Sequence, residues 1–378
     1  MDFVFSDEQE QLRMVVRAFL ADKTPGRYVR AMLDDDRGVT DEVWRAMSEL
    51  GWAGLLVPEA HGGAGLGMLE AVVLCEEMGR LPLPGPWLSS AVAASLVAVA
   101  LDDTALLPHL ADGSARATLA LEETGTRDPL DRISTTATRG PGDQWLLHGL
   151  KPVVLDGHTA DVAYVVAREA SSAGAPEGAL GTFAVDAPAA EPVPSLDVTR
   201  KVTRLVLDGR SARRVGPPGD QRALLARVVD DVGIALCAES VGACDRALQM
   251  ATDYAKDRVQ FGRPIATFQV IKHKIVDMLH QLELARVATH YAAWASTTNG
   301  AHGGDHERER AAAMAKGFVA EAAVMITGEN IQVHGGVGFT WDVDCHLLFR
   351  RVKANDVLFG RQAWQRQRLA DLVLDARQ

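Results

Sequence analysis

The C-terminal part of the chain, from about residue 221 onward, consists of long helical patterns separated only by short breaks. The patterns cover 221–258, 267–298, 307–328 and 342–375, and the breaks fall at 262–264, 299–300 and 335–336. Each segment is long enough to cross a domain, and short connections make successive helices antiparallel neighbours. We therefore expect four long helices that pack as an antiparallel bundle.

The two preceding regions have different patterns. From residue 3 to about residue 115 the chain reads as helical, and Ser6 followed by Gln9 is the capping-box pattern of a helix start. Residues 116–215 carry short apolar runs bounded by Gly, Asp, Pro and Ser, which predicts an antiparallel β domain. We therefore expect an α+β multidomain fold, with an N-terminal helical domain, a β-barrel-like middle domain and a four-helix bundle over 1–115, 116–215 and 216–378.

Charge and cysteine usage narrow the possible functions. A net charge of -11 at pH 7 argues against nucleic acid as a partner, because phosphate binding depends on lysine and arginine. The N-terminus has no signal-peptide pattern, and no uninterrupted apolar stretch reaches about 18 residues, so we expect a cytoplasmic protein without a membrane association. The four cysteines show neither metal-ligand nor disulfide spacing, and no metal site is expected.

Two motifs in the predicted bundle combine side chains that suit a phosphorylated, aromatic ligand. The first contains Arg258, Phe261 and Gly262, followed by Phe268 and Gln269, and the second is the run Gln332-Val333-His334-Gly335-Gly336. Arginine offers planar, bidentate donors to a pyrophosphate, and glutamine supplies both a donor and an acceptor. Paired glycines lack a Cβ, so their backbone can approach a ring or a phosphate closely.

These motifs, together with Glu49-Leu-Gly51-Trp52 and the glycine-rich segment after Pro58, resemble the acyl-CoA dehydrogenase family in order and spacing over almost the whole chain. The resemblance implies the acyl-CoA dehydrogenase fold, FAD as cofactor, α,β-desaturation of an acyl-CoA thioester, and electron transfer to an electron-transferring flavoprotein. It also implies a tetramer in which one subunit reaches the FAD of its neighbour through Arg258, Phe261, Phe268, Gln269, Gln332, Val333, His334, Gly335 and Gly336.

The position of the family's proton-abstracting base departs from the pattern. In many members a glutamate just before a C-terminal glycine removes the α-proton, and this position holds Phe359. Some members use a position on the first bundle helix that falls near Val232. Neither side chain can accept a proton. Glu239, two helical turns beyond Val232, is a candidate base, and the alternative is a buried carboxylate that pairs with arginine or lysine.

Other departures also concern this chain's own active site. Val153 and Leu155 replace an aromatic residue and a hydroxyl that commonly touch the flavin ring, and Gly233 replaces an arginine that commonly meets coenzyme A. The loop that wraps the flavin corresponds to 121–128 and keeps only an acidic residue and one glycine. The motifs that reach a neighbour's cofactor are intact, whereas those for the chain's own reaction are weakened.

We therefore expect a subunit that pairs with a catalytically complete acyl-CoA dehydrogenase subunit, as in the mixed assemblies of actinobacterial dehydrogenases for steroid-CoA substrates. In that arrangement the chain performs no proton abstraction and completes the partner's FAD site. Two alternatives stay open. One is a self-sufficient dehydrogenase, in a homotetramer, and the other is a family member repurposed for another flavin reaction, such as oxygen-dependent oxidation.

Overall fold

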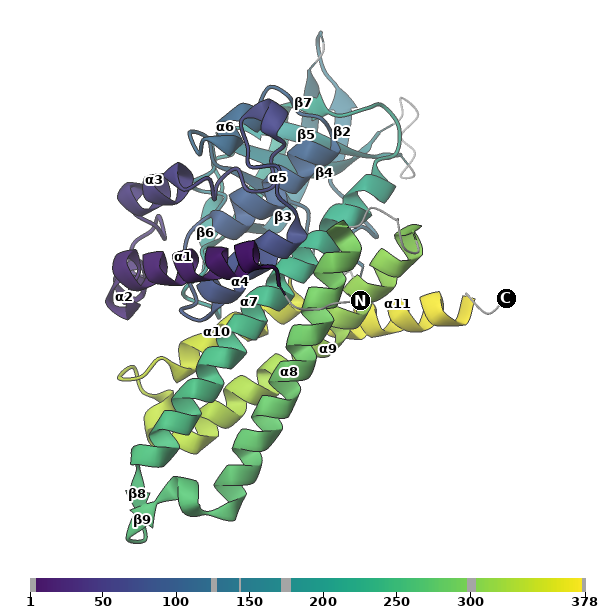
Figure 1. Ribbon diagram of the computed structural model, residues 1–378. Coiled ribbons are helices and arrows are strands. Elements are labelled where there is room, and N and C mark those ends of the chain that lie inside the picture. The colour runs from purple at the N-terminus through teal and green to yellow at the C-terminus, as the bar shows by residue number, and fades with distance from the viewer. Residues whose placement is uncertain (1–4, 124–127, 143, 171–177, 298–303, 376–378) are drawn as a thin grey trace.

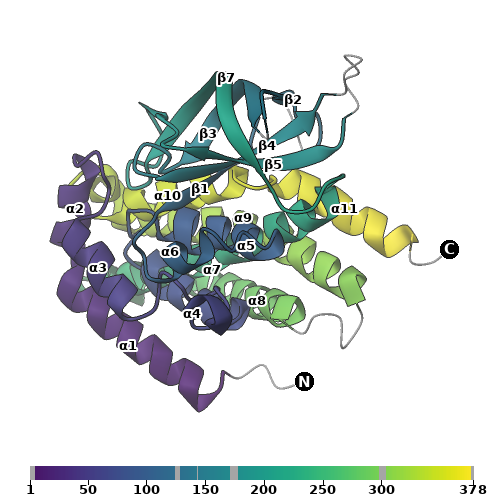
Figure 2. The ribbon, with the colours of Figure 1, turned by 90° about the horizontal axis from the view of Figure 1, so that it is seen from above.

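The structure is a computed structural model that describes residues 5–123, 128–142, 144–170, 178–297 and 304–375. Figure 2 shows a β-sheet region stacked on a layer of helices. Half of the expected flavin-wrapping loop, residues 124–127, lies outside the described residues. Within them, the fold combines helical N- and C-terminal parts with a middle sheet, as the sequence predicts.

The N-terminal part is helical. The predicted capping box is confirmed, because the Gln9 N–H donates to the Ser6 hydroxyl at 3.3 Å and the Ser6 N–H donates to the Gln9 side chain at 3.0 Å. A π-helical segment over Trp87–Ala94 leads into a short α-helix, and both are largely buried. The α-helices are α1 (Asp7–Lys23), α2 (Gly26–Leu33), α3 (Asp41–Glu49), α4 (Met68–Gly79), α5 (Ser95–Ala100) and α6 (Leu107–Ala111).

The middle part is a sheet of seven strands: β1 (Ala117–Ala120), β2 (Thr136–Arg139), β3 (Trp145–Leu155), β4 (Val162–Glu169), β5 (Leu180–Asp186), β6 (Glu191–Val193) and β7 (Val202–Val215). Strand order β1-β4-β2-β3-β7-β5, with β5 also paired to β4, closes the sheet on itself. Most pairs are antiparallel as expected, but β1 and β2 each pair with β4 in parallel. Short apolar runs indicate strands without indicating the direction of their partners, so these two pairs could not be predicted.

Three long helices and two shorter ones form the C-terminal part: α7 (Arg222–Asp257), α8 (Gln269–Thr297), α9 (Gly304–His334), α10 (Cys345–Val357) and α11 (Gln362–Asp375). The prediction of one continuous helix over 342–375 is wrong. Phe359 and Gly360 have φ angles of 54° and 93°, and these left-handed conformations reverse the chain between α10 and α11. Gly360 is a local signal for this break, but a single glycine inside a helical pattern does not by itself end a predicted helix.

Close packing of α4 on α7 depends on two glycines. A Cβ at Gly79 would lie 2.0 Å from the Glu239 carbonyl oxygen, and a Cβ at Gly242 would lie 1.9 Å from the Glu76 carbonyl oxygen. Only glycine therefore permits this helix contact. By length and composition the segment Asp305–Phe339, which contains most of α9, could cross a membrane, but 67% of its apolar window is buried inside the protein, as in the core helix of a bundle.

Candidate functional site

The residues predicted to reach a neighbour's cofactor gather at one end of the bundle. Here a hairpin of β8 (Val259–Gln260) and β9 (Arg263–Pro264) joins α7 to α8. His334 at the end of α9 stacks on Tyr254 near the end of α7, with ring centroids 4.3 Å apart. This contact brings the second motif beside the first, and the two together are called the bundle-end cluster: Arg258, Phe261, Phe268, Gln269, Gln332, Val333, His334, Gly335 and Gly336.

Most of the bundle-end cluster faces solvent. The side chain of Phe261 is 92% exposed on a left-handed turn with φ 53°, and its ring meets that of Phe268 edge-on at 6.1 Å. Arg258 and the two glutamines, Gln269 and Gln332, are also exposed. Val333 and His334 are buried and fix the helix end instead. Exposed phenylalanine next to arginine is unfavourable in an isolated chain and is typical of a surface that a partner covers.

The geometry of this cluster fits a flavin dinucleotide. Gly335 has a φ of 64°, and neither a Cβ at Gly335 nor one at Gly336 would meet another atom within 4 Å, so the backbone there is open to an incoming ring or phosphate. In the described part of the chain no side chain pairs with the Arg258 guanidinium, which leaves its donors available for a pyrophosphate. Arg258, the two glutamines and these glycines would hold the cofactor.

The bundle-end cluster is far from the residues expected at this chain's own active site. Figure 1 shows the β8–β9 hairpin at one extremity of the bundle and the sheet at the other. Val153 and Leu155 belong to β3, and Leu155 is buried in the core. Phe359 lies between α10 and α11, and its ring is also buried. The bundle-end cluster and β3 therefore lie at opposite extremities of the chain (Figure 1).

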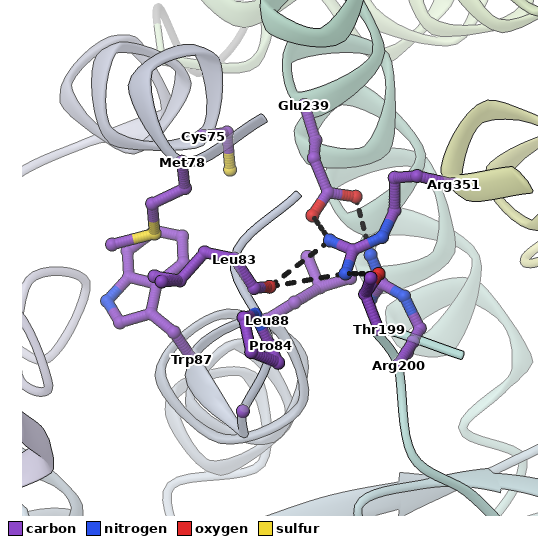
Figure 3. Close-up of a pocket in the computed structure, with 11 residues that line it drawn as sticks. Cys75, Met78, Leu83, Pro84, Trp87, Leu88, Thr199, Arg200, Glu239 and Arg351 are labelled. Atoms are coloured by element: carbon purple, nitrogen blue, oxygen red, sulfur yellow. Dashed lines mark hydrogen bonds and ion pairs between the residues drawn. The ribbon is translucent and has the colours of Figure 1, made fainter. Parts of the chain in front are cut away.

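Glu239 lies in a buried charged network rather than at an open site (Figure 3). Its carboxylate accepts from Arg200 at 2.5 Å and from Asn355 at 2.8 Å, and its other oxygen accepts from Arg351. Arg351 in turn donates to Asp197 at 2.6 Å and to the Thr199 hydroxyl at 2.5 Å. These contacts are those of the structural alternative, a buried carboxylate paired with arginine.

The electrostatics of the network also disfavour Glu239 as a base. Burial raises the pKa of its carboxyl, but the Arg200 and Arg351 guanidinium groups and the Asn355 amide more than offset this, and the pKa lies below its usual range. A carboxylate with a lowered pKa is a weak proton acceptor. The adjoining cavity, lined by Cys75, Met78, Trp87 and Leu88 among others, encloses only about 20 Å³, room for about one water molecule.

A second group of buried charges surrounds Phe359, and the sequence reading did not identify it. The Glu122 carboxylate accepts the Phe359 backbone N–H at 2.5 Å. The neighbouring Glu123 pairs with the fully buried Lys151 at 2.6 Å, and Lys316 of α9 donates to the Asn355 carbonyl at the end of α10. The sequence shows only two consecutive acidic residues shortly after a short strand. Their partners come from β3 and from the turn after α10, so the sequence alone does not indicate a buried charged group.

Burial raises the pKa of Glu122, and the Phe359 N–H, Lys316 and Arg361 only partly oppose it. Glu123 behaves differently, because Lys151 and the Ser134 and Thr135 hydroxyls outweigh its burial and lower its pKa to about 2. Burial lowers the pKa of Lys151 to about 8 despite this pair. Their surroundings therefore shift the pKa values of these adjacent carboxyls in opposite directions, a pattern that occurs at functional sites.

Two positions on α7 that the sequence singled out are not occupied by reactive groups. Val232 is fully buried, and a Cβ added at Gly233 would meet no atom within 4 Å. Among the described residues, no group of three or more His, Cys, Asp or Glu side chains could hold a metal ion. Val232 and Phe359, the side chains at the two base positions of the family, are therefore both buried and apolar.

Comparison with known proteins finds relatives along most of the chain. Models of the N-terminal and C-terminal domains of acyl-CoA dehydrogenase match residues 6–105 and 231–374. The chain is 33% identical over 348 residues to the acyl-CoA dehydrogenase IpdE2 of Mycobacterium tuberculosis, which covers 91% of both proteins.

Two similar solved structures are assemblies of two different chains. A variant of the Tcur3481–Tcur3483 steroid ACAD is 31% identical with a TM-score of 0.85, and the match covers 98% of this chain and 99% of that one. The ChsE4–ChsE5 complex of Mycobacterium tuberculosis is 25% identical with a TM-score of 0.85 and covers 99% of each chain. With its motifs, fold and relatives in agreement, the chain belongs to the acyl-CoA dehydrogenase family.

Proposed function

We propose that this chain is one subunit of a heteromeric acyl-CoA dehydrogenase and that its bundle-end cluster completes the FAD site of a different, catalytically complete subunit. The family is FAD-dependent, and bound FAD accepts the hydride when an acyl-CoA is desaturated. In this proposal Arg258 supplies positive charge to the pyrophosphate of that FAD. Gln269 and Gln332 hydrogen-bond to it, and Gly335 and Gly336 allow the backbone to approach it.

The observation that carries the proposal is the separation of the intact residues from the weakened ones. The bundle-end cluster keeps its arginine, glutamines and glycines and exposes them at one extremity (Figure 1). At the two base positions of this chain's own active site the side chains are apolar. Glu239, the other candidate base, is neutralised by Arg200 and Arg351. A subunit that only completes its partner's site needs the first group and not the second.

The relatives support the partner and the substrate class. Both solved assemblies described above combine two different chains, and one of them is a steroid ACAD. The proposed assembly is therefore a tetramer with another acyl-CoA dehydrogenase subunit, acting on a bulky acyl-CoA in the cytoplasm and passing electrons to an electron-transferring flavoprotein.

The visible absorption spectrum tests the proposal. The chain is expressed alone and together with the acyl-CoA dehydrogenase encoded beside it. We expect a colourless lone chain and a yellow complex with one flavin for every two chains. Arg258→Ala should then remove most of the flavin from the complex. Arg310→Ala, which changes an exposed arginine in the N-terminal half of α9, is the matched control and should leave the flavin in place.

A lone chain with one flavin per chain would overturn the proposal and favour a self-sufficient enzyme. Acyl-CoA oxidation by that lone chain would identify a dehydrogenase. Oxygen consumption without an added electron acceptor would identify the oxidase alternative instead.

A further inference from the structure

The turn after α10 presents a backbone donor in a fixed direction. Phe359 and Gly360 both have positive φ, and a Cβ at Gly360 would lie 2.6 Å from the Trp364 ring. Trp364 therefore packs directly on the turn, while Lys316 anchors the last turn of α10 through the Asn355 carbonyl. A donor held in this way needs no rearrangement to stabilise negative charge on an acceptor.

Glu122 is the acceptor of that donor. Its Oε1 lies 2.5 Å from the Phe359 nitrogen, within hydrogen-bonding distance. The contact joins the end of β1 to the turn between α10 and α11, which are 237 residues apart in sequence. Lys316, Arg361 and Lys151 all contribute positive potential at this carboxyl. Burial outweighs these charges and raises the pKa of the Glu122 carboxyl, so the fixed Phe359 N–H is the contact that holds its oxygen in place.

The chemistry of desaturation indicates which ligand atom the Phe359 N–H would bind in a site without Glu122. The α-carbon that loses its proton at the family's base position is bonded directly to the thioester carbonyl carbon. Negative charge moves onto the carbonyl oxygen as the proton leaves, so a rigid N–H at the base position suits that oxygen. A carboxyl oxygen accepts the same hydrogen bond.

We propose that the Glu122 carboxylate occupies the place of the acyl-thioester oxygen in this chain's own half of the assembly, so that this half binds no acyl-CoA. The proposal deepens the proposed function and rests on it, because it gives a physical reason why only the partner's half binds substrate. Glu122 acts here as a built-in occupant of the site, and no bond to it forms or breaks.

The structural anchoring of this segment is carried by the next residue. Glu123 accepts from Lys151 at 2.6 Å, from the Ser134 N–H at 2.7 Å and from the Thr135 hydroxyl at 2.7 Å. These contacts tie the end of β1 to β3 and to the segment before β2. Substitution of Glu122 leaves all of them in place, so a variant at this position should fold.

The test counts acyl-CoA sites in the co-expressed complex by calorimetric titration with 3-thiaoctanoyl-CoA. This probe keeps the thioester carbonyl but has sulfur in place of the β-carbon, so it cannot be oxidised and the readout is binding alone. We expect one probe site for every two chains in the wild-type complex. In the Glu122→Ala complex we expect two probe sites for every two chains. Glu122→Gln is the matched variant and should stay at one site, because the glutamine oxygen still accepts the Phe359 N–H.

An unchanged count in Glu122→Ala, whatever the wild-type count, would overturn the proposal. So would a wild-type complex that already binds one probe per chain, or a Glu122→Gln complex that binds as many as Glu122→Ala. Circular dichroism and flavin content of both variants establish that they fold and assemble. The proposed function is tested separately, by the flavin content of the lone chain and of the Arg258→Ala complex. If that test contradicts the proposed function, the titration is repeated on the lone chain.

Discussion

Substitution of Glu239 tests the charged network between α7, α10 and the segment before β7. In Glu239→Ala the Arg200 guanidinium would keep only the Asn355 side chain at 3.4 Å and Asp197 at 4.0 Å. Arg351 would keep Asp197, the Thr199 hydroxyl and the Pro82 and Leu83 carbonyls, so Arg200 is the charge that loses its close partner. Removal of one partner from a buried ion pair costs about 3–5 kcal/mol, because the remaining charge stays buried without compensation. Such a loss is a large fraction of the stability of a typical domain.

Glu239→Gln should lose less, because one acceptor oxygen remains for Arg200 or Arg351. A hydrogen bond to a charged group contributes about 1.5–3 kcal/mol, and we expect a loss in that range at pH 7. The pKa of Glu239 is lowered in the folded chain, so its contribution is present above the ordinary carboxyl pKa and disappears as the pH falls through the folded value. The difference between wild type and Glu239→Gln should therefore shrink below the ordinary carboxyl pKa.

Urea unfolding of the assembled protein at several pH values measures this difference. Glu283→Gln is the matched control, since Glu283 pairs with Arg286 on the surface of α8 and its side chain is 53% exposed. That control should change stability by less than about 1 kcal/mol. The reasoning is refuted if Glu239→Gln is as stable as the control. If it is as stable and also abolishes acyl-CoA oxidation, Glu239 is the base after all.

Three further predictions concern packing and charge. Gly242→Ala should destabilise the protein by about 1–3 kcal/mol or prevent folding, because its Cβ would overlap the Glu76 carbonyl. Gly233→Ala on the same helix should stabilise the protein by up to about 1 kcal/mol, because its Cβ would meet no atom within 4 Å. Thermal unfolding compares the two variants. Glu123 has a pKa of about 2, so acid should remove its stabilisation as the pH falls from its ordinary value near 4.5 towards 2, and Glu123→Gln should flatten that part of the stability curve. Asp230→Ala should leave the Arg308 and Arg368 guanidinium groups without their shared carboxylate and release α11, which hydrogen exchange would detect as lost amide protection in α11 with α7 still protected.

Local patterns in the sequence predicted much of the architecture. The limits of α7 and α8, the capping box at Ser6 and the helical, sheet, helical order depend on periodicity and end signals, and all of them are found in the structure. The turn at Phe359 was missed, since Phe359 itself carries no turn signal and a single glycine such as Gly360 is tolerated inside a helical pattern. The domain limits at 115 and 215 and the roles of the individual site residues stay predictions.

The sequence by itself determined the family, the bundle-end motifs and the absence of a carboxylate at the usual base positions, because these depend only on which residues occur and in what order. The tertiary structure decided what the remaining carboxylates do. Both Glu239 and Glu122 are glutamates whose sequence neighbours do not reveal their partners. Glu239 is neutralised by arginines from two other segments, whereas Glu122 accepts a backbone N–H 237 residues away. Those partners are distant along the chain, and only folding brings their charges and donors within hydrogen-bonding distance.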